Sequence, residues 1–402
     1  MVEIDFSVME CNPGDADSLR PLMDAFETQY HIHVNLIGIN WVRGWTEIAK
    51  FGIYGHGPDV SAIGTTWIGS LAAMHALRPI TPQQVGTLGG AEAFFESNWK
   101  TCFFPDDQTP WAIPWLGDAL VYYYWKDALE KAGIKDADAA FASDAALVDT
   151  LKKLQKSGSA YPLSVNITKQ EIILHEAAHW VWNAGGNLVS DDGQQVIFNQ
   201  PAAMQGWKNY FGLQPFISPT LLKGETDIAA SEYFLRRESA VQVGGPYKTF
   251  AEVLETTELK DQPMGVAKMP GFTFTGGTSF VIWQYSRQHQ EAFELVRFLS
   301  SQPTRIPASP HSYELPTRRE AMHRMSSVES NIFHRTYIEA VQTGRSFPTM
   351  RLWGSIEEKL IASISKIWEE LFDDPDLDLD ACLHRHLDPA AARLNVILEN
   401  YV

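Results

Sequence analysis

Cysteine is scarce in this chain. Only three occur in 402 residues, and Cys11, Cys102 and Cys382 lie far apart in the sequence. No two have the close spacing of a zinc ribbon, and no framework of several disulfides can be drawn. One disulfide between distant cysteines stays open, because only the folded geometry decides which sulfur atoms meet. Buried or free thiols are the simpler expectation.

Basic residues are also few. The chain carries 32 Lys and Arg against 49 Asp and Glu, which gives a formal net charge of −17. Nucleic acids and anionic membrane surfaces are bound through clustered Lys and Arg, so this balance argues against both as partners. A small anionic ligand stays open, since the charge around one site can differ from the total.

Long apolar runs are missing as well. No segment approaches the roughly 20 apolar residues that a transmembrane helix needs. The N-terminus leads directly into a strand pattern over 4–10 and shows no signal peptide. This indicates either a cytosolic start or an export signal that has been removed.

The first sixty residues alternate between strand and helix patterns. Strand patterns cover 4–10, 32–39 and a segment from Asp59, while apolar residues recur at helical spacing over 19–30 and 45–54. This order predicts a doubly wound α/β lobe, and such sheets bind ligands at the carboxyl ends of their strands. The residues after the strands are therefore candidates for ligand contact: Glu10, Asn12, Trp41, Thr66 and Trp67.

Beyond residue 134 helical patterns dominate. We expect helices over 171–184, 201–211, 290–299, 330–342, 356–371 and 389–398, and strands over 194–198, 239–243 and 276–282. A chain of this length is too long for one compact core, so two lobes are expected. No flexible linker separates them, which favours lobes joined by several strand crossings.

The segment 110–134 combines a proline-broken strand with a dense aromatic run. Pro114 so close to a strand argues for an edge or a crossing point. We interpret Ile113-Pro114 as the first crossing between the lobes, with Trp115 and Asp118 at the edge of a cleft. The run Tyr122–Trp125 is expected to be a buried strand of the second lobe.

One string has the pattern of a zinc site. His175-Glu176-Ala177-Ala178-His179 matches HExxH, in which two imidazoles one helical turn apart bind zinc and the glutamate acts as a base. No third ligand follows at the spacing of the known zinc proteases. A zinc-dependent hydrolase is therefore kept as an alternative to a second interpretation, in which His175 and Glu176 hydrogen-bond a ligand in a cleft.

Aromatic residues are the other unusual feature, with 13 tryptophans in the chain. Most large aromatic side chains belong to a core. Trp41, Trp67, Trp115 and Tyr247 each follow a strand or begin a helix, and Trp353 lies in a late loop. Aromatic faces beside polar groups are typical of a pocket that stacks against the ring of a sugar.

Seven segments match, in order along nearly the whole chain, the motifs of one known family. They are Gly57-Pro58-Asp59-Val60, Ala76-Leu77-Arg78-Pro79-Ile80, the hinge segment 113–134, Ala184-Gly185-Gly186, Gly244-Gly245-Pro246-Tyr247, Gly276-Gly277-Thr278 and Leu315-Pro316-Thr317-Arg318. In this ordered set the chain resembles the extracytoplasmic solute-binding proteins of ABC sugar importers, family 1, the group that contains maltose-binding protein. Two features depart from the family: Tyr247 stands where it often has Trp, and the string from His175 to His179 has no family counterpart.

The resemblance implies a type II periplasmic-binding-protein fold. Its two lobes would each be a doubly wound sheet with flanking helices, and the ligand cleft would lie between them. The N-lobe is expected to hold residues 1–114 and 279–325, and the C-lobe 115–278 and 326–402. Carried over position by position, the family's ligand contacts fall on Glu10, Asn12, Thr66, Trp67, Trp115, Asp118, His175, Glu176, Tyr247, Gly277, Thr278 and Trp353.

The implied function is that of a carrier. Two lobes would close on a carbohydrate by hinge motion, and the closed form would be recognised by an ABC permease. Such a protein is extracytoplasmic, in the periplasm or lipid-anchored at the cell surface, and is expected to be a monomer without cofactor, metal or catalytic residue. A binding protein for a non-sugar solute, such as a polyamine, a peptide or a metal complex, remains an alternative.

Overall fold

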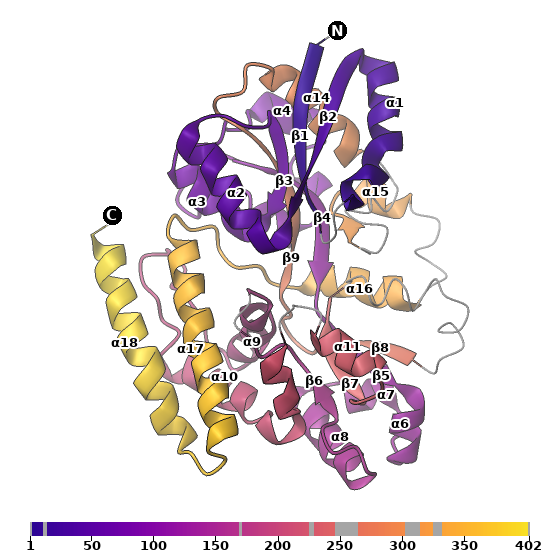
Figure 1. Cartoon of the computed structure of the whole chain (residues 1–402), viewed down its shortest axis with the longest axis vertical. Helices are drawn as coiled ribbons and strands as arrows, with labels where there is room; N and C mark the ends of the chain where they lie inside the picture. The colour runs from indigo at the N-terminus through magenta and orange to yellow at the C-terminus, as the bar shows by residue number, and fades with distance from the viewer. Residues whose placement is uncertain are drawn as a thin grey trace.

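The computed structural model describes residues 2–10, 14–168, 171–224, 229–245, 264–301, 314–324 and 332–400. Two separate β-sheets organise these residues (Figure 1). No helix within the described ranges is both long enough and apolar enough to cross a membrane.

The larger sheet has six strands in the order β10-β4-β9-β3-β1-β2. Their bounds are β1 Val2–Glu10, β2 Ile32–Asn40, β3 Val60–Gly64, β4 Ile113–Ala119, β9 Thr275–Ile282 and β10 Leu315–Pro316. β1 runs parallel to β2 and β3, while β9 lies antiparallel between β3 and β4. The β–α–β–α–β start predicted from the alternating patterns is confirmed.

Helices cover both faces of this sheet in Figure 1. They are η1 Asp15–Leu19, α1 Arg20–Tyr30, α2 Trp41–Tyr54, η2 Thr65–Trp67, α3 Ile68–Ala73, α4 Pro82–Thr87, η3 Ala91–Ala93, α5 Glu96–Lys100, α14 His289–Ser300 and α15 Arg319–His323. Successive strand residues point to opposite faces, so β9 contributes Phe280 and Ile282 to one core and Val281 to the other.

The smaller sheet has four strands in the order β6-β7-β5-β8. Their bounds are β5 Val121–Trp125, β6 Leu163–Ser164, β7 Val241–Gly244 and β8 Met264–Lys268. All five residues of β5 are buried, which confirms the buried strand expected for the run Tyr122–Trp125.

A mostly helical body surrounds this second sheet. Its helices are α6 Lys126–Lys131, α7 Ala137–Ala140, α8 Asp144–Lys156, α9 Glu171–Asn183, α10 Pro201–Phe211, η4 Gln214–Phe216, η5 Pro219–Lys223, α11 Ala229–Leu235, α16 Ile332–Thr343, α17 Trp353–Asp373 and α18 Leu379–Glu399. α9, α10, α17 and α18 share one large apolar core with the buried face of β5. Cys382 belongs to that core and Cys102 to the first lobe, both as free thiols, while Cys11 lies outside the described residues.

The two sheets meet where β4 continues into β5. Leu120 is the one residue between them, and its N–H donates to the carbonyl of Phe274 at 3.3 Å. The segment 269–274 therefore crosses from β8 to β9 beside the first crossing, and the loop after α16 returns to α5. β4 pairs with β9 as far as Ala119, so all of β4 belongs to the sheet of the first lobe. We therefore propose lobe boundaries at Leu120 and Phe274, in place of those expected after residues 114 and 278.

Two elements differ from the sequence prediction. Residues 194–198 form no strand beyond a single bridge between Val196 and Val189. The last helix begins at Leu379, ten residues before Pro389. Asp378 caps it, because its Oδ1 accepts from the N–H of Ala381 at 3.2 Å, and burial of Leu383, Leu387 and Leu394 offsets the backbone hydrogen bond that a proline inside a helix removes.

The pairing of β4 with β9 requires a glycine at position 277. Gly277 has φ +116°, and a Cβ there would lie 2.1 Å from the carbonyl oxygen of Leu116. We expect Gly277→Ala to lower the free energy of unfolding by about 2–4 kcal/mol, since it adds both a backbone strain and a clash. Urea unfolding measures this. The matched control is Gly86→Ala, on an open face of α4, which should leave stability unchanged or raise it by up to about 1 kcal/mol. Equal effects of the two substitutions would contradict the prediction.

Candidate functional site

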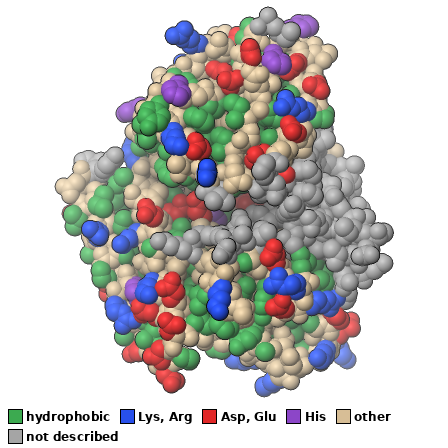
Figure 2. Space-filling model, in the orientation of Figure 1, with side chains coloured by type: hydrophobic (Ala, Val, Ile, Leu, Met, Phe, Trp, Pro, Cys, Tyr) green, Lys and Arg blue, Asp and Glu red, His purple; other side chains and the backbone are tan. Residues whose placement is uncertain are grey.

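A cavity lies where β3 ends, between the six-stranded sheet and the helical body. It is lined by three threonines from the first lobe and by residues of two crossing segments: Thr65, Thr66, Thr101, Phe274, Ser346, Phe347, Pro348 and Thr349. Figure 2 shows acidic side chains in the hollow between the upper and lower halves of the molecule. The position agrees with the rule that open α/β sheets bind ligands at the carboxyl ends of their strands.

The turn after β3 is shaped by tryptophans around a glycine. β3 ends at Gly64 and continues directly into η2, which carries Thr65 and Thr66 toward the cavity. A Cβ on Gly64 would lie 3.3 Å from the Trp41 ring and 3.6 Å from the Trp67 ring, so the missing side chain lets both indoles pack over the strand end. The two rings lie 5.4 Å apart between centroids, with Trp67 buried and Trp41 half-buried.

The opposite wall is a loop that is tied to the first lobe. Ser346 Oγ donates to the carbonyl of Thr275 at 2.7 Å, and Thr349 Oγ1 donates to the carbonyl of Thr101 at 2.8 Å. These bonds hold Phe347 and Pro348 against the cavity. The loop therefore belongs structurally to both lobes.

Stacked aromatic rings support this wall from behind. Phe347 lies 4.5 Å from Trp353 and 4.9 Å from Phe274 between ring centroids. The His175 imidazole stacks on Phe274 at 4.0 Å and an interplanar angle of 9°. The ring faces of Phe274 and Phe347 thus have fixed orientations beside the hydroxyl groups of the cavity.

Two buried polar atoms face each other behind the aromatic wall. His175 Nε2 lies 3.9 Å from Glu357 Oε1, and neither atom has a hydrogen-bond partner among the described residues. Burial lowers the pKa of His175 to about 3, and it raises the pKa of Glu357 to about 8, with a further contribution from the negative charge of Glu171. Both groups are therefore uncharged at neutral pH and can accept or donate a hydrogen bond.

The HExxH string does not converge on one point. Glu176 is buried and accepts from the N–H of Asn166 at 2.9 Å and from its side-chain amide at 2.7 Å. The ring nitrogens of His179 lie 2.8 Å from the carbonyl of Phe272 and 2.9 Å from Asp144 Oδ1. His175 faces Glu357 instead. The three side chains thus hold separate parts of the second lobe together, and the arrangement gives the zinc-hydrolase alternative no support.

Several other residues expected at the site lie in the framework around it. Trp115 is 3% exposed and stacks on Phe280 at 4.5 Å inside the core of the first lobe. Trp353 is 1% exposed, and its ring stacks on Phe347, which itself lines the cavity. Gly277 and Thr278 lie within β9, opposite Gly117 and Leu116 of β4.

The two acidic residues expected at strand ends have backbone partners. Glu10 accepts from the N–H groups of Gly14 and Ala16 at 3.2 and 3.4 Å and so links the end of β1 to the start of η1. Asp118 accepts from the N–H of Gly276 at 2.9 Å, and burial raises its pKa to about 6. Asn12 and Tyr247 lie outside the described residues.

Of the expected residues, the structure therefore brings Thr66 to the cavity and His175 to its rear wall, with Trp41 and Trp67 beside it. Sequence reasoning missed Thr101, Phe274, Ser346, Phe347 and Thr349. It also missed Glu357, although a glutamate on the apolar face of a helix, four residues after Trp353, is a visible signal.

Comparisons with known proteins agree on one group. The sequence profile of the bacterial extracellular solute-binding proteins matches residues 12–305. An ABC transporter-binding protein of Deinococcus radiodurans is 25% identical over 199 residues, which cover 47% of this chain and 47% of that protein. The chain thus matches about half the length of this curated relative.

Solved structures match over the whole chain. The sugar-binding protein MalE of Xanthomonas citri has a TM-score of 0.82 at 19% identity and covers 100% of this chain and 98% of its own. An ABC transporter solute-binding protein of Thermotoga lettingae, bound with α-D-tagatose, has a TM-score of 0.81 at 19% identity. The match covers 99% of this chain and 100% of that protein. This likeness confirms the predicted two-lobe fold.

The buried glutamate of the HExxH string makes stability depend on pH. Burial raises the pKa of Glu176 from 4.5 to about 8, against the opposing effect of the Asn166 hydrogen bonds. Between these two values the folded protein keeps a proton that the unfolded chain has lost. Glu176 should therefore make the free energy of unfolding fall as pH rises from 5 toward 8, while His175, whose pKa is lowered, acts in the opposite direction below about pH 6.5.

In Glu176→Gln this fall should become shallower by up to about 1.4 kcal/mol per pH unit, because one titrating group is removed. Urea unfolding at several pH values measures the slope. Glu358→Gln, at an exposed position of α17, is the control and should keep the original slope. An unchanged slope in Glu176→Gln would refute the assignment.

Proposed function

Because this chain belongs to the bacterial extracellular solute-binding proteins, we propose that it is the substrate-binding component of an ABC importer and that it binds a carbohydrate in the cavity at the end of β3. The observation that carries the choice of ligand is the composition of the cavity wall. It combines the hydroxyl groups of Thr65, Thr66, Thr101, Ser346 and Thr349 with the flat faces of Phe274 and Phe347.

That composition suits a neutral, polyhydroxylated ring. Aromatic faces supply apolar contact for the CH groups of a sugar, and side-chain hydroxyls bind its hydroxyl groups. Thr101, Ser346 and Thr349 already donate to backbone carbonyls, so their hydroxyl oxygens accept from the sugar, while Thr65 and Thr66 can donate or accept. The rear wall fits the same ligand, since His175 and Glu357 are uncharged at neutral pH. The structural neighbours that bind sugars, among them the tagatose-bound protein, support the same choice.

Binding proceeds by closure of the two lobes around three crossing segments. These are Leu120, residues 269–274 and the loop 344–352, and rotation is absorbed by their backbone torsions. Phe274 and Phe347 lie on two of these crossings, so the cavity wall forms as the lobes approach. Closure removes water from the cavity. Each hydrogen bond to the ligand then contributes more to the binding free energy, because an unpaired buried polar group costs about 1–3 kcal/mol.

The proposal includes the partners and the site of action. The closed form is recognised by an ABC permease, the ligand leaves chemically unchanged, and the protein acts as a monomer outside the cytoplasm, free or lipid-anchored. Contacting residues are proposed to be Thr66, Phe274 and Phe347, with Trp41 at the edge and the pair His175 and Glu357 behind the aromatic wall. Asn12 and Tyr247 keep their proposed contacts from the sequence.

A thermal-shift screen over saccharides, polyamines, amino acids and peptides tests the ligand class. A ligand at one hundred times its dissociation constant should stabilise the protein by about 2.7 kcal/mol. We expect at least one saccharide to do so. A flat response to every saccharide with a clear response to a polyamine or peptide would replace the carbohydrate by that solute.

Once a ligand is found, Thr66→Val tests the cavity. Valine keeps the shape of threonine but lacks its hydroxyl, so the loss of one hydrogen bond should weaken binding by about 0.5–1.5 kcal/mol without changing the melting temperature of the free protein. Titration calorimetry measures the affinity. Thr28→Val, at an exposed position of α1, should bind as the unchanged protein does. Normal binding by Thr66→Val would place the ligand elsewhere.

A further inference from the structure

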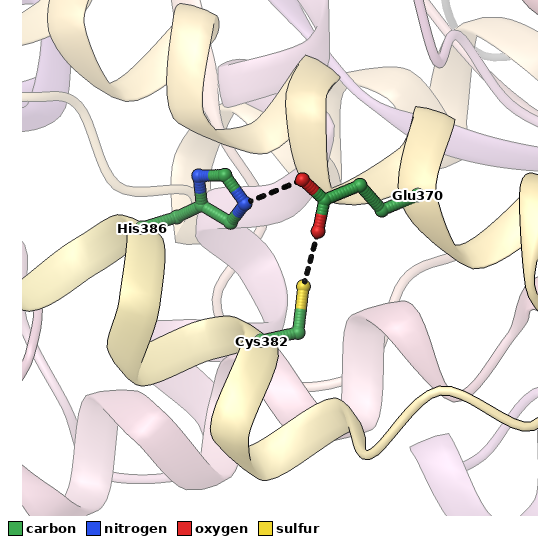
Figure 3. Close-up of side chains that lie close together, drawn as sticks. All are labelled: Glu370, Cys382 and His386. Atoms are coloured by element: carbon green, nitrogen blue, oxygen red, sulfur yellow. Dashed lines mark hydrogen bonds and ion pairs between the residues drawn. The ribbon is translucent and has the colours of Figure 1, made fainter.

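Three metal-ligating side chains meet between the last two long helices. Glu370 lies near the end of α17, while Cys382 and His386 come from α18. Figure 3 shows the thiol and the imidazole pointing at the two different oxygens of the Glu370 carboxylate. One potential ligand atom from each residue lies within 4.8 Å of the others.

The helical hairpin fixes this meeting point. Cys382 and His386 are four residues apart, so both side chains lie on the same face of α18. α17 and α18 are joined by only a few residues and lie side by side (Figure 1). Cys382 is buried with Leu383 and Leu387 in the core, whereas the side chains of Glu370 and His386 remain 26% and 19% exposed. The cluster is thus anchored on one side and open to solvent on the other.

Its dimensions fit a tetrahedral ion. Zinc binds nitrogen and oxygen at about 2.0–2.1 Å and thiolate sulfur at about 2.3 Å, so a tetrahedron has N–O edges of about 3.3 Å and S–O edges of about 3.6 Å. The distance from His386 Nε2 to Glu370 Oε1 is 3.1 Å, and that from Cys382 Sγ to Glu370 Oε2 is 3.5 Å. Because these two distances end at different oxygens of one carboxylate, the Glu370 carboxylate must turn so that a single oxygen faces both Nε2 and Sγ, and these three atoms then form three corners of such a site.

We propose that Glu370, Cys382 and His386 form a binding site for a divalent transition-metal ion of the zinc type, with water as the fourth ligand. A thiolate and an imidazole select such ions over Mg²⁺ and Ca²⁺, which prefer oxygen ligands. On binding, the thiol releases its proton to solvent and the sulfur bonds to the metal. The ion links α17 to α18 and so stabilises the C-terminal hairpin.

Arg385 is a built-in competitor for this site. Its guanidinium pairs with Glu370 Oε2, the same oxygen that faces the thiol, and its side chain is 54% exposed. In the metal-free protein this cation balances the carboxylate. A bound metal supplies that charge instead, and Arg385 is free to swing into solvent.

The metal site is separate from the sugar cavity. Glu357 and Glu370 are thirteen residues apart on α17, which corresponds to about 20 Å along the helix. Metal binding and ligand binding can therefore be tested independently, and failure of one leaves the other standing.

Titration of the full-length, reduced protein with Zn²⁺ alone tests the proposal. We expect one zinc per chain and a higher melting temperature with zinc. Cys382→Ser and His386→Gln should each raise the dissociation constant at least tenfold, whereas Arg385→Ala should lower it several-fold. The matched control is His384→Gln, which removes an exposed histidine of α18 that pairs with Asp388 and should leave zinc affinity unchanged.

Cobalt supplies a readout that a purely structural role of these residues would not change. Bound Co²⁺ should show the charge-transfer absorption of a cobalt–thiolate bond, and Cys382→Ser should lose it while keeping the native circular dichroism spectrum. If Cys382→Ser fails to fold, His386→Gln still tests the site, because His386 is partly exposed and its substitution should leave the fold intact. Three results would overturn the proposal. They are binding of less than one zinc per chain, zinc affinity that is unchanged in both Cys382→Ser and His386→Gln, and zinc affinity that falls in Arg385→Ala.

Discussion

The structure depends on one continuous run of backbone that belongs to two sheets. β4 pairs with β9 as far as Ala119, and β5 begins at Val121 in the other sheet. The returning segment is bound to this junction, because Phe274 accepts from the N–H of Leu120 and Thr273 Oγ1 donates to the Leu120 carbonyl at 3.0 Å. Two chain crossings are thereby fixed side by side, and they set the position of the cavity and, in the proposed closure, the axis of rotation of the lobes.

Phe274 links this junction to the site. Its carbonyl takes part in the crossing, while its ring lines the cavity and stacks on His175. A rotation of the lobes that moves the backbone at 274 therefore also moves the aromatic wall. Ser346 and Thr349 act in the same way on the third crossing, where their hydroxyls bind backbone carbonyls of the first lobe. The proposed hinge and the proposed binding surface thus share residues, so in this proposal a ligand that contacts the wall favours one rotation of the lobes.

Sequence patterns predicted most of the described elements, but they did not predict which side chains become neighbours. The parallel strands of the first lobe follow from apolar alternation, and the motifs in chain order indicated the family. Trp115 and Trp353 were expected at the ligand because they follow strands or lie in loops, yet Trp115 is covered by Phe280 of β9, and Trp353 by Phe347, six residues earlier in the chain. The contact of Trp115 is long-range and leaves no local pattern, whereas Trp353 was expected in a loop and instead begins α17 on its buried face. The meeting of Cys382 and His386 at Glu370 was hidden for a different reason, since Pro389 suggested a helix start where the helix in fact continues.

The charge state of the rear wall bears on the kind of ligand that the cavity accepts. Burial keeps both His175 and Glu357 neutral at pH 7, although the chain as a whole carries −17. A neutral saccharide can bind without any change of protonation. A polyamine would draw its binding energy from an ionised Glu357, whose proton must first be removed at a cost of about 1.4 kcal/mol for each unit by which its pKa exceeds the pH. That cost is small enough for a cation to meet, but binding would then release a proton and strengthen as the pH rises, whereas sugar binding would do neither. The ligand classes thus differ in proton linkage even where their affinities coincide.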